Sequence, residues 1–313
     1  MGSADVVPGV SGGTIAFITG IYEELLESIS KINFSVLKTL KNDGLKTAWH
    51  QINGNFLAVL LLGIITSFLT LAKLVDFLLH DYPIQIWSFF FGLVLASVWL
   101  VGKSIKIWNF TTIIALILGT VVAYYITILP PFTDSQNLLY IFICGAIAIC
   151  AMILPGISGS FILVLLGAYG TVMGSISDLL SAIKAGEWGL VFSNGLILAV
   201  FALGCLIGLL SFSKLLNYLF KKAKTIVLAV LTGFLIGSLN KIWPWKETLE
   251  VYIKHKGEAN EEIIPLVERN ITPSQFENLP LSSDSFLLPA IGLFLVGLAV
   301  LIVLDRLAPK TES

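Results

Sequence analysis

Two short stretches of this sequence combine proline, glycine and serine in a pattern that suits the binding of an anion. The first is 8–13 (Pro-Gly-Val-Ser-Gly-Gly) and the second is 155–160 (Pro-Gly-Ile-Ser-Gly-Ser). Proline disfavours helix in the residue before it, and glycine removes the penalty for non-helical backbone. We therefore expect each stretch to interrupt a helix and to present free backbone N–H groups where the next helix begins. Such groups, together with hydroxyl donors and the helix dipole, form an anion or phosphate site.

The residues predicted to bind the anion are small or hydroxyl residues of the two stretches, together with one lysine downstream of each. They are Gly9, Ser11, Gly12, Gly13, Thr14, Gly156, Ser158, Gly159, Ser160, Lys73 and Lys214. Two alternative interpretations stay open. The small residues would also allow close packing of helices, and the lysines would also extend to the membrane interface.

Two acidic residues flank the first stretch and have no acidic counterparts beside the second. Asp5 precedes it and Glu23 follows it. A carboxylate near the middle of a membrane is a candidate for proton coupling, whereas one at the membrane edge is simply solvated. The three histidines lie in polar connections and the three cysteines inside apolar runs, so the sequence indicates neither a metal site nor a cofactor.

The composition indicates an integral membrane protein. Of the 313 residues, 56% are hydrophobic and 12% are charged, whereas soluble domains contain about 25% charged residues. The formal net charge of −1 provides no basic field for nucleic acid. The bilayer is therefore the expected environment, and nucleic acid is not an expected partner.

Eight runs without charged residues or histidine are candidates for membrane segments, because a spanning helix needs about 20 apolar residues. The run 135–177 would be roughly 64 Å long as one helix, about twice the thickness of the hydrocarbon core. We expect it to fold back at the second stretch as a re-entrant hairpin. The other runs are 6–22, 56–72, 84–102, 107–133, 188–213, 225–240 and 285–304.

The sequence contains an internal repeat that relates the two stretches. The first stretch and its following Gly-Ile-Tyr match the second stretch and its Gly-Ala-Tyr 147 residues later, and 63–76 matches 204–217. The predicted units are 1–134 and 135–313, and the second contains an extracytoplasmic loop at 241–284. The second unit has an apolar limb, 138–154, before its stretch, whereas the first has only 1–7. We expect either that the first hairpin has lost this limb or that residues precede Met1.

The repeat and the loop charges predict the topology. Three full helices separate the stretches, and an odd number inverts the second unit relative to the first. Lysines lie in the connections 23–55, 103–106 and 221–224, whereas 80–83 and 130–137 have none, which places the former on the cytoplasmic side. We expect an all-α polytopic membrane protein of two inverted repeats, each with a re-entrant hairpin and three transmembrane helices. Segment 23–40 is predicted to be one helix, either on the cytoplasmic membrane surface or as a linker.

The segments 2–23 and 154–169 resemble the bacterial polyprenyl-phosphate transporter family, formerly a domain of unknown function. The resemblance implies a multi-pass protein of the bacterial cytoplasmic (inner) membrane. It implies the return of undecaprenyl phosphate to the cytoplasmic leaflet for cell-envelope synthesis, with the phosphate bound by Ser11, Gly12, Gly13, Thr14 and their counterparts Ser158, Gly159 and Ser160. The expected partners are this lipid and the bilayer, and protons or another ion are candidates for coupling.

Two alternatives to lipid transport remain at this stage. A channel or carrier for chloride or phosphate would use the same anion site without a lateral opening to lipid. A membrane lipid phosphatase would need a nucleophile with a base or a metal, and no histidine lies within an apolar run. The sequence therefore favours a transporter over an enzyme, and it leaves the direction of transport and the oligomeric state open.

Overall fold

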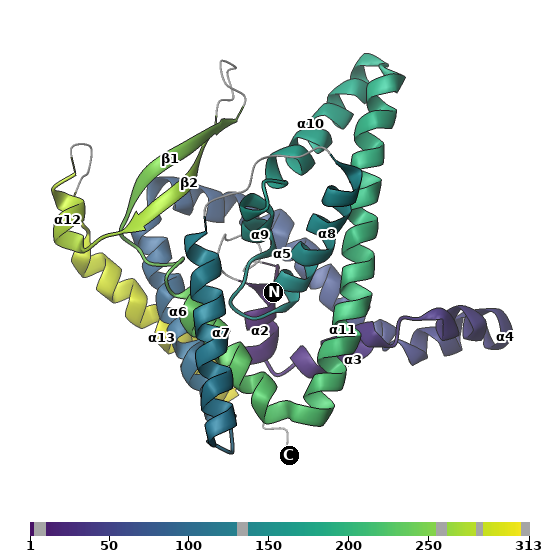
Figure 1. Ribbon diagram of the computed structural model, residues 1–313, viewed down its shortest axis with the longest axis horizontal. Coiled ribbons are helices and arrows are strands. Elements are labelled where there is room, and N and C mark those ends of the chain that lie inside the picture. The colour runs from purple at the N-terminus through teal and green to yellow at the C-terminus, as the bar shows by residue number, and fades with distance from the viewer. Residues whose placement is uncertain (3–10, 130–136, 255–261, 280–283, 308–313) are drawn as a thin grey trace.

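The structure, a computed structural model, describes residues 1–2, 11–129, 137–254, 262–279 and 284–307 (Figure 1). It is predominantly helical, with one two-stranded sheet. The helices are α2 (Gly12–Ile18), α3 (Tyr22–Ser30), α4 (Phe34–Gln51), α5 (Gly54–Asp81), α6 (Pro83–Lys103), α7 (Phe110–Ile128), α8 (Leu138–Ile153), α9 (Gly159–Leu165), α10 (Tyr169–Ala185), α11 (Trp188–Ser238), α12 (Pro273–Glu277) and α13 (Leu287–Leu307).

The length and apolar composition of the helices make this a multi-pass membrane protein. Among the described residues, α5, α6, α7 and α11 are long and apolar enough to cross a bilayer. Helices α9 and α10 together are also long and apolar enough, but a bend of 104° separates them, so they form either a broken span or a re-entrant loop. The prediction of a helical polytopic membrane protein is therefore confirmed.

Helix α11 combines two of the predicted spans. It contains 51 residues, which would be roughly 77 Å as a straight helix. The backbone leaves the helical conformation at Ala223 (φ −144°, ψ 45°). In Figure 1 the first limb of α11 runs along one edge of the molecule, and the second limb turns back into its centre. The two limbs correspond to the predicted runs 188–213 and 225–240.

Glycines bring pairs of helices into close contact. Helix α6 packs on α13, where a methyl group added to Gly92 would lie 2.1 Å from the carbonyl oxygen of Phe294. In the reverse direction, a methyl group on Gly297 would lie 2.2 Å from the carbonyl oxygen of Phe89. Membrane helices lack a hydrophobic driving force between them, and such close approach provides the packing that holds them together.

The same arrangement occurs between α7 and the second limb of α11. A methyl group on Gly233 would lie 2.3 Å from the carbonyl oxygen of Leu116, and one on Gly119 would lie 2.6 Å from that of Val230. Each of these two helix pairs therefore has a glycine on both helices at its contact.

A two-stranded antiparallel sheet was not predicted by the sequence analysis. Strand β1 (Lys246–Lys254) pairs with β2 (Glu262–Asn270), and Lys246 lies opposite Asn270. The strands contain β-branched and aromatic residues, which favour this conformation, but they lie inside a segment that we had treated as an irregular extracytoplasmic connection. The indole N–H of Trp243 donates to the carbonyl oxygen of Ile271 at 2.8 Å and so ties the base of the hairpin to the end of α11.

The predicted single helix over 23–40 is wrong. It is broken between α3 and α4, where the Asn33 side chain accepts from the Ser35 N–H and caps α4. The apolar residues of α3 are buried in the core rather than facing a membrane surface. Helix α4 is itself broken at Gly44 (φ 84°), so its second limb folds back and Gln51 donates to the Ser35 hydroxyl at 3.0 Å. In Figure 1 this helical hairpin projects away from the body of the molecule.

Candidate functional site

The two glycine-rich stretches meet in space. The Ser11 hydroxyl donates toward the carbonyl oxygens of Met152 and Leu154, each 3.1 Å away. In the other direction, the Gly156 N–H donates to the Thr14 hydroxyl at 3.0 Å. A methyl group added to Gly13 would lie 2.3 Å from the carbonyl oxygen of Ile153, so only glycine permits this approach. Residues more than 140 positions apart in the sequence therefore contact one another.

The hydroxyls of Ser11 and Thr14 bond to backbone at and just before the second stretch. Both side chains are buried, and Ser11 also accepts from the Gly13 N–H as the N-cap of α2. In this structure they join the two stretches to each other. Gly12 begins α2 and is buried beside them. Gly9 and Asp5, which were also predicted to act here, lie outside the described residues.

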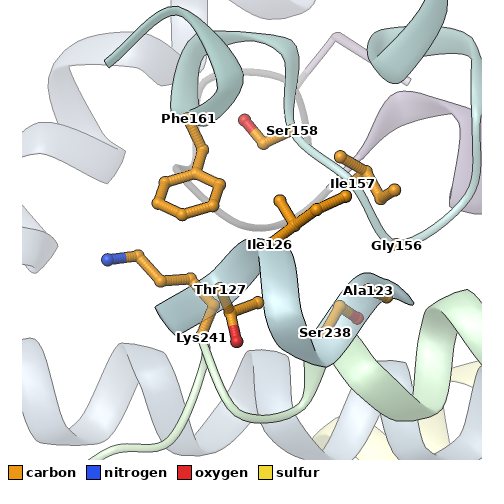
Figure 2. A pocket seen from close by; sticks show the side chains of 9 residues that line it. All are labelled: Ala123, Ile126, Thr127, Gly156, Ile157, Ser158, Phe161, Ser238 and Lys241. Carbon is orange, nitrogen blue, oxygen red and sulfur yellow. The ribbon is translucent and has the colours of Figure 1, made fainter. Parts of the chain in front are cut away.

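The second stretch lines a small pocket (Figure 2). Gly156 has a positive φ of 85°, which lets the chain turn there without strain. Ser158 lines the pocket, and its hydroxyl pairs with the Ser160 hydroxyl at 2.9 Å. Gly159 begins α9, where a methyl group would lie 2.7 Å from the carbonyl oxygen of Ala148 on α8.

The walls of the pocket are mostly apolar, with a few polar groups. The space of about 10 Å³ is near the minimum for one water molecule, so a phosphate group would have to widen it. The lining residues are Ala123, Ile126, Thr127, Gly156, Ile157, Ser158, Phe161, Ser238 and Lys241.

Lys241 is a pocket residue that the sequence analysis missed. It follows the end of α11, where its backbone N–H donates to the carbonyl oxygen of Ser238 at 2.9 Å. Its Nζ lies 4.8 Å from the centre of the Phe161 ring, close enough for a cation–π contact. Figure 2 shows the Lys241 side chain extending toward this ring. A lysine directly after an apolar run is typical of a membrane interface, and only the fold brings this one to the second stretch.

A carboxylate and a second lysine complete the charge around the pocket. Glu268 of β2 accepts from Lys241 with Oε2 at 2.8 Å from Nζ, and the same oxygen lies 3.4 Å from the Nζ of Lys246. The Lys246 Nζ also lies 4.4 Å from the centre of the Trp87 ring. Each of the three charged side chains is at most 19% exposed, so water screens their interaction only weakly.

The pKa values of this cluster follow from burial and charge. Burial lowers the pKa of Lys246 to about 8, although Glu268 acts in the opposite direction. Burial would raise the pKa of Glu268, but the two ammonium groups outweigh it and hold the pKa below its ordinary value. The cluster has one carboxylate for two ammonium groups, so it has a net positive charge at neutral pH.

The remaining predicted residues lie away from the pocket or outside the described side chains. Lys214 is exposed on α11 and is not among the residues that line the pocket. Lys73 belongs to α5, but its side chain is outside the described part of the chain. Glu23 pairs with Lys224 at 2.7 Å, and both side chains are more than half exposed. The roles suggested for these residues stay predictions.

Within the described residues, no three histidine, cysteine, aspartate or glutamate side chains lie close enough together to hold a metal ion. The three cysteines are free thiols.

Comparison with known proteins identifies the relatives of this chain. Residues 1–260 match the family described as undecaprenyl phosphate translocase-like. The chain is 48% identical over 310 residues to the polyprenyl-phosphate transporter of Vibrio cholerae serotype O1, covering 99% of this chain and 94% of that protein. It is 34% identical over 276 residues to the polyprenyl-phosphate transporter of Staphylococcus aureus, covering 81% and 89%. No solved structure matches. These names confirm the family resemblance seen in the sequence, and they are the names of transporters rather than enzymes.

Proposed function

Because this chain belongs to the undecaprenyl phosphate translocase-like family, we propose that it moves undecaprenyl phosphate, or a similar polyprenyl phosphate, across the bacterial cytoplasmic membrane. The lipid carrier would thereby return to the cytoplasmic leaflet for another round of cell-envelope synthesis. The two relatives named polyprenyl-phosphate transporters support the substrate class. The multi-pass helical fold supports the membrane location.

The observation that carries this proposal is the junction of the two stretches beside a cation. A phosphate monoester has a charge of about −1.5 to −2 at neutral pH and accepts several hydrogen bonds. Ser158 and Lys241 line one pocket and offer a hydroxyl and an ammonium donor. Ile126 and Ile157 line the same pocket and offer apolar surface to the first isoprene units. We propose that the phosphate binds here when the pocket widens, between the hydroxyls of Ser158 and Ser160 and the Lys241 ammonium group.

The proposal includes two inverted repeats, 1–134 and 135–313. The contact of α6 with α13 has a counterpart in the contact of α7 with the second limb of α11. Contact residues of α6 correspond to residues of α11 that lie 141 positions later, and those of α7 correspond to residues of α13 that lie 178 positions later. In each pair one helix belongs to the first unit and the other to the second, as a pseudo-two-fold axis between the units would produce. The matched residues are Phe89 and Val230, Gly92 and Gly233, Leu116 and Phe294, and Gly119 and Gly297.

The second unit supplies the support for a re-entrant hairpin. Helix α8 has 16 residues and α9 has seven, and both are too short to cross a bilayer alone. The chain reverses between them at the second stretch, where Gly156 has its positive φ. Irregular backbone at membrane depth is tolerated only where protein or a wet cavity surrounds it, and the stretch is surrounded by α2, α7 and α11.

A transport assay tests the proposed function. Liposomes containing only this protein would receive labelled undecaprenyl phosphate in one leaflet, and its appearance in the other leaflet would be followed with and without a proton gradient. We expect the lipid to cross faster than in protein-free liposomes, while chloride and orthophosphate do not. Acceleration by the gradient would support proton coupling, for which Asp5 and Glu23 are the predicted candidates. Movement of the small anions without the lipid would contradict the proposal and favour an anion carrier.

A substitution in the pocket tests the site. Ser158→Ala removes the hydroxyl of a residue that lines the pocket. Loss of its hydrogen bond to the charged phosphate would decrease transport by roughly tenfold. Ser97→Ala is the matched control, because Ser97 is also buried but donates to the carbonyl oxygen of Leu93 within its own helix. Equal transport by the two variants, at equal amounts of folded protein, would remove Ser158 from the site.

A further inference from the structure

We propose that Lys241 binds the phosphate group of the lipid and that Glu268 is the carboxylate which that phosphate displaces. This inference rests on the proposed function, which already places the phosphate beside Lys241, and adds the role of Glu268 as a competing carboxylate. In this view, the ion pair between β2 and the end of α11 occupies the ammonium group that the substrate needs. Phosphate binding then exchanges one anionic partner of Lys241 for another.

The geometry allows this exchange because Lys241 lies between Glu268 on one side and the pocket proposed for the phosphate on the other. Its Nζ is 2.8 Å from Glu268 Oε2, while its side chain lines the pocket that contains Ser158. The Phe161 ring lies 4.8 Å from the same nitrogen and also lines the pocket. Its face can hold the ammonium group on the pocket side through a cation–π contact. A change of Lys241 rotamers is therefore sufficient to turn the charge from Glu268 toward the second stretch.

The second lysine makes the exchange electrostatically acceptable. A buried carboxylate that loses its only partner is strongly destabilising. Glu268 does not lose its only partner, because Lys246 lies 3.4 Å from the same carboxylate oxygen. After the exchange, Lys246 would pair with Glu268 and Lys241 with the phosphate. Each anion would then have one ammonium partner, whereas in this structure two lysines share one carboxylate.

The surroundings of the pocket tie the exchange to the β-hairpin. Glu268 belongs to β2 and Lys246 begins β1. At the end of β2, Asn270 donates to the Asn240 side chain at 2.9 Å, and Asn240 donates to Thr127 of the pocket wall at 2.8 Å. Loss of the pair between Lys241 and Glu268 would leave the hairpin attached through these amide contacts. The hairpin therefore provides a fixed support for the competing carboxylate.

A second ion pair on the same hairpin provides a matched control. Glu247 and Arg269 lie opposite each other on the two strands, and the Arg269 Nη2 is 2.6 Å from Glu247 Oε2. Arg269 is 65% exposed, and neither residue lines the pocket. Glu247→Gln and Glu268→Gln remove the same charge from the same hairpin, but only the second frees a lysine of the pocket.

The test measures binding of a fluorescent short-chain polyprenyl phosphate to the purified full chain in lipid nanodiscs. Because a carboxylate held in the same molecule competes at a high effective concentration, we expect Glu268→Gln to tighten binding by roughly fivefold to tenfold. Lys241→Gln should weaken binding by about tenfold or more, because it removes a charge-assisted contact to phosphate. Lys241→Arg should retain most of the binding, and Glu247→Gln should remain within about twofold of the unchanged protein.

The outcomes separate this inference from the proposed function. If the unchanged protein binds the probe and Glu268→Gln does not bind it more tightly than Glu247→Gln, the exchange is wrong. If Lys241→Gln folds and binds as well as the unchanged protein, Lys241 is not the phosphate ligand. If Lys241→Gln fails to fold, the comparison of Glu268→Gln with Glu247→Gln still shows whether Glu268 competes with the phosphate. A protein that neither binds nor transports the polyprenyl phosphate would instead overturn the proposed function itself.

Discussion

Ser11 and Ser158 occupy matched positions in the two stretches but have different partners. Ser11 donates to the carbonyl oxygens of Met152 and Leu154, just before the second stretch, whereas Ser158 lines the pocket and its hydroxyl pairs with the Ser160 hydroxyl. The hydroxyl of Ser11 is therefore bound to backbone, whereas that of Ser158 is bound to another side chain, which can rotate. The proposed function accordingly assigns the phosphate to Ser158 and the junction of the two segments to Ser11.

Lys246 leads to a prediction about stability and pH. Its pKa falls from an ordinary value of 10.5 to about 8 in the folded protein. Between pH 8 and 10.5 the unfolded chain holds a proton that the folded protein has lost, so stability rises with pH in this window. Below pH 8 both states are protonated, and the full penalty of burying the ammonium group applies.

We therefore expect the unchanged protein to gain stability relative to Lys246→Met as the pH rises from 8 to 10. The gain would be at most about 3 kcal/mol, and it would be measured as the difference between the thermal unfolding temperatures of the two proteins in detergent. Lys38→Met, which removes an exposed lysine of α4, controls for the loss of a charge alone. If the difference in unfolding temperature between the unchanged protein and Lys246→Met stays constant from pH 8 to 10, the lowered pKa of Lys246 would be contradicted.

The residues of the second stretch could be predicted from the sequence, but the charge beside them could not. Pro155 and the glycines after it disfavour a continuous helix, so the helix break could be predicted from the local sequence alone. Lys241 and Glu268 lie 27 positions apart, in a segment without any repeat partner. Their meeting depends on the pairing of β1 with β2, which places Glu268 beside the end of α11. No local pattern encodes that contact.

At the scale of elements, α4 packs only sparsely against the rest of the described structure. Its two limbs contact each other, and among its residues only Ala48 is buried. Large apolar side chains face outward, with Phe34 at 88% and Leu37 at 63% exposed. The lysines of α4, Lys38, Lys41 and Lys46, are exposed as well. Apolar residues mixed with lysines are typical of helices that lie in the interface of an anionic membrane.

We expect the first limb of α4 to enter the membrane interface. A nitroxide label would be attached at Leu37→Cys in a protein whose three native cysteines are replaced by alanine. Oxygen, which partitions into lipid, should relax this label more than a water-soluble nickel complex in vesicles with anionic lipid. The matched control is a label at Leu249→Cys, because Leu249 is an apolar residue of β1 that is 53% exposed. Equal accessibility of both labels to the nickel complex would show that α4 stays in water.

At the scale of the whole molecule, most membrane helices follow from the apolar runs. The runs 56–72, 84–102 and 107–133 correspond to α5, α6 and α7. The long run 135–177 divides into α8, α9 and α10, because a single helix of that length does not fit a bilayer. The two limbs of α11 follow from the runs 188–213 and 225–240, and the break at Ala223 (φ −144°, ψ 45°) falls in the lysine-containing connection predicted between them. The β-hairpin was not predicted, because its strands lie in a segment that has no repeat partner.

The matched glycine contacts lead to a prediction about the packing of the two units. Gly92 lies against α13 and Gly233 against α7, each within 2.3 Å of a carbonyl oxygen once a methyl group is added. Gly92→Ala and Gly233→Ala should each destabilise the protein by about 1–3 kcal/mol, since the helices must separate to admit the methyl group. Gly292→Ala on α13 is the control, because a methyl group there meets nothing within 4 Å and alanine favours helix. Thermal unfolding in detergent would compare the three. If the proposed two-fold axis relates the units, the losses at Gly92 and Gly233 should be similar, and a loss at only one of them would argue against equivalent packing of the two halves.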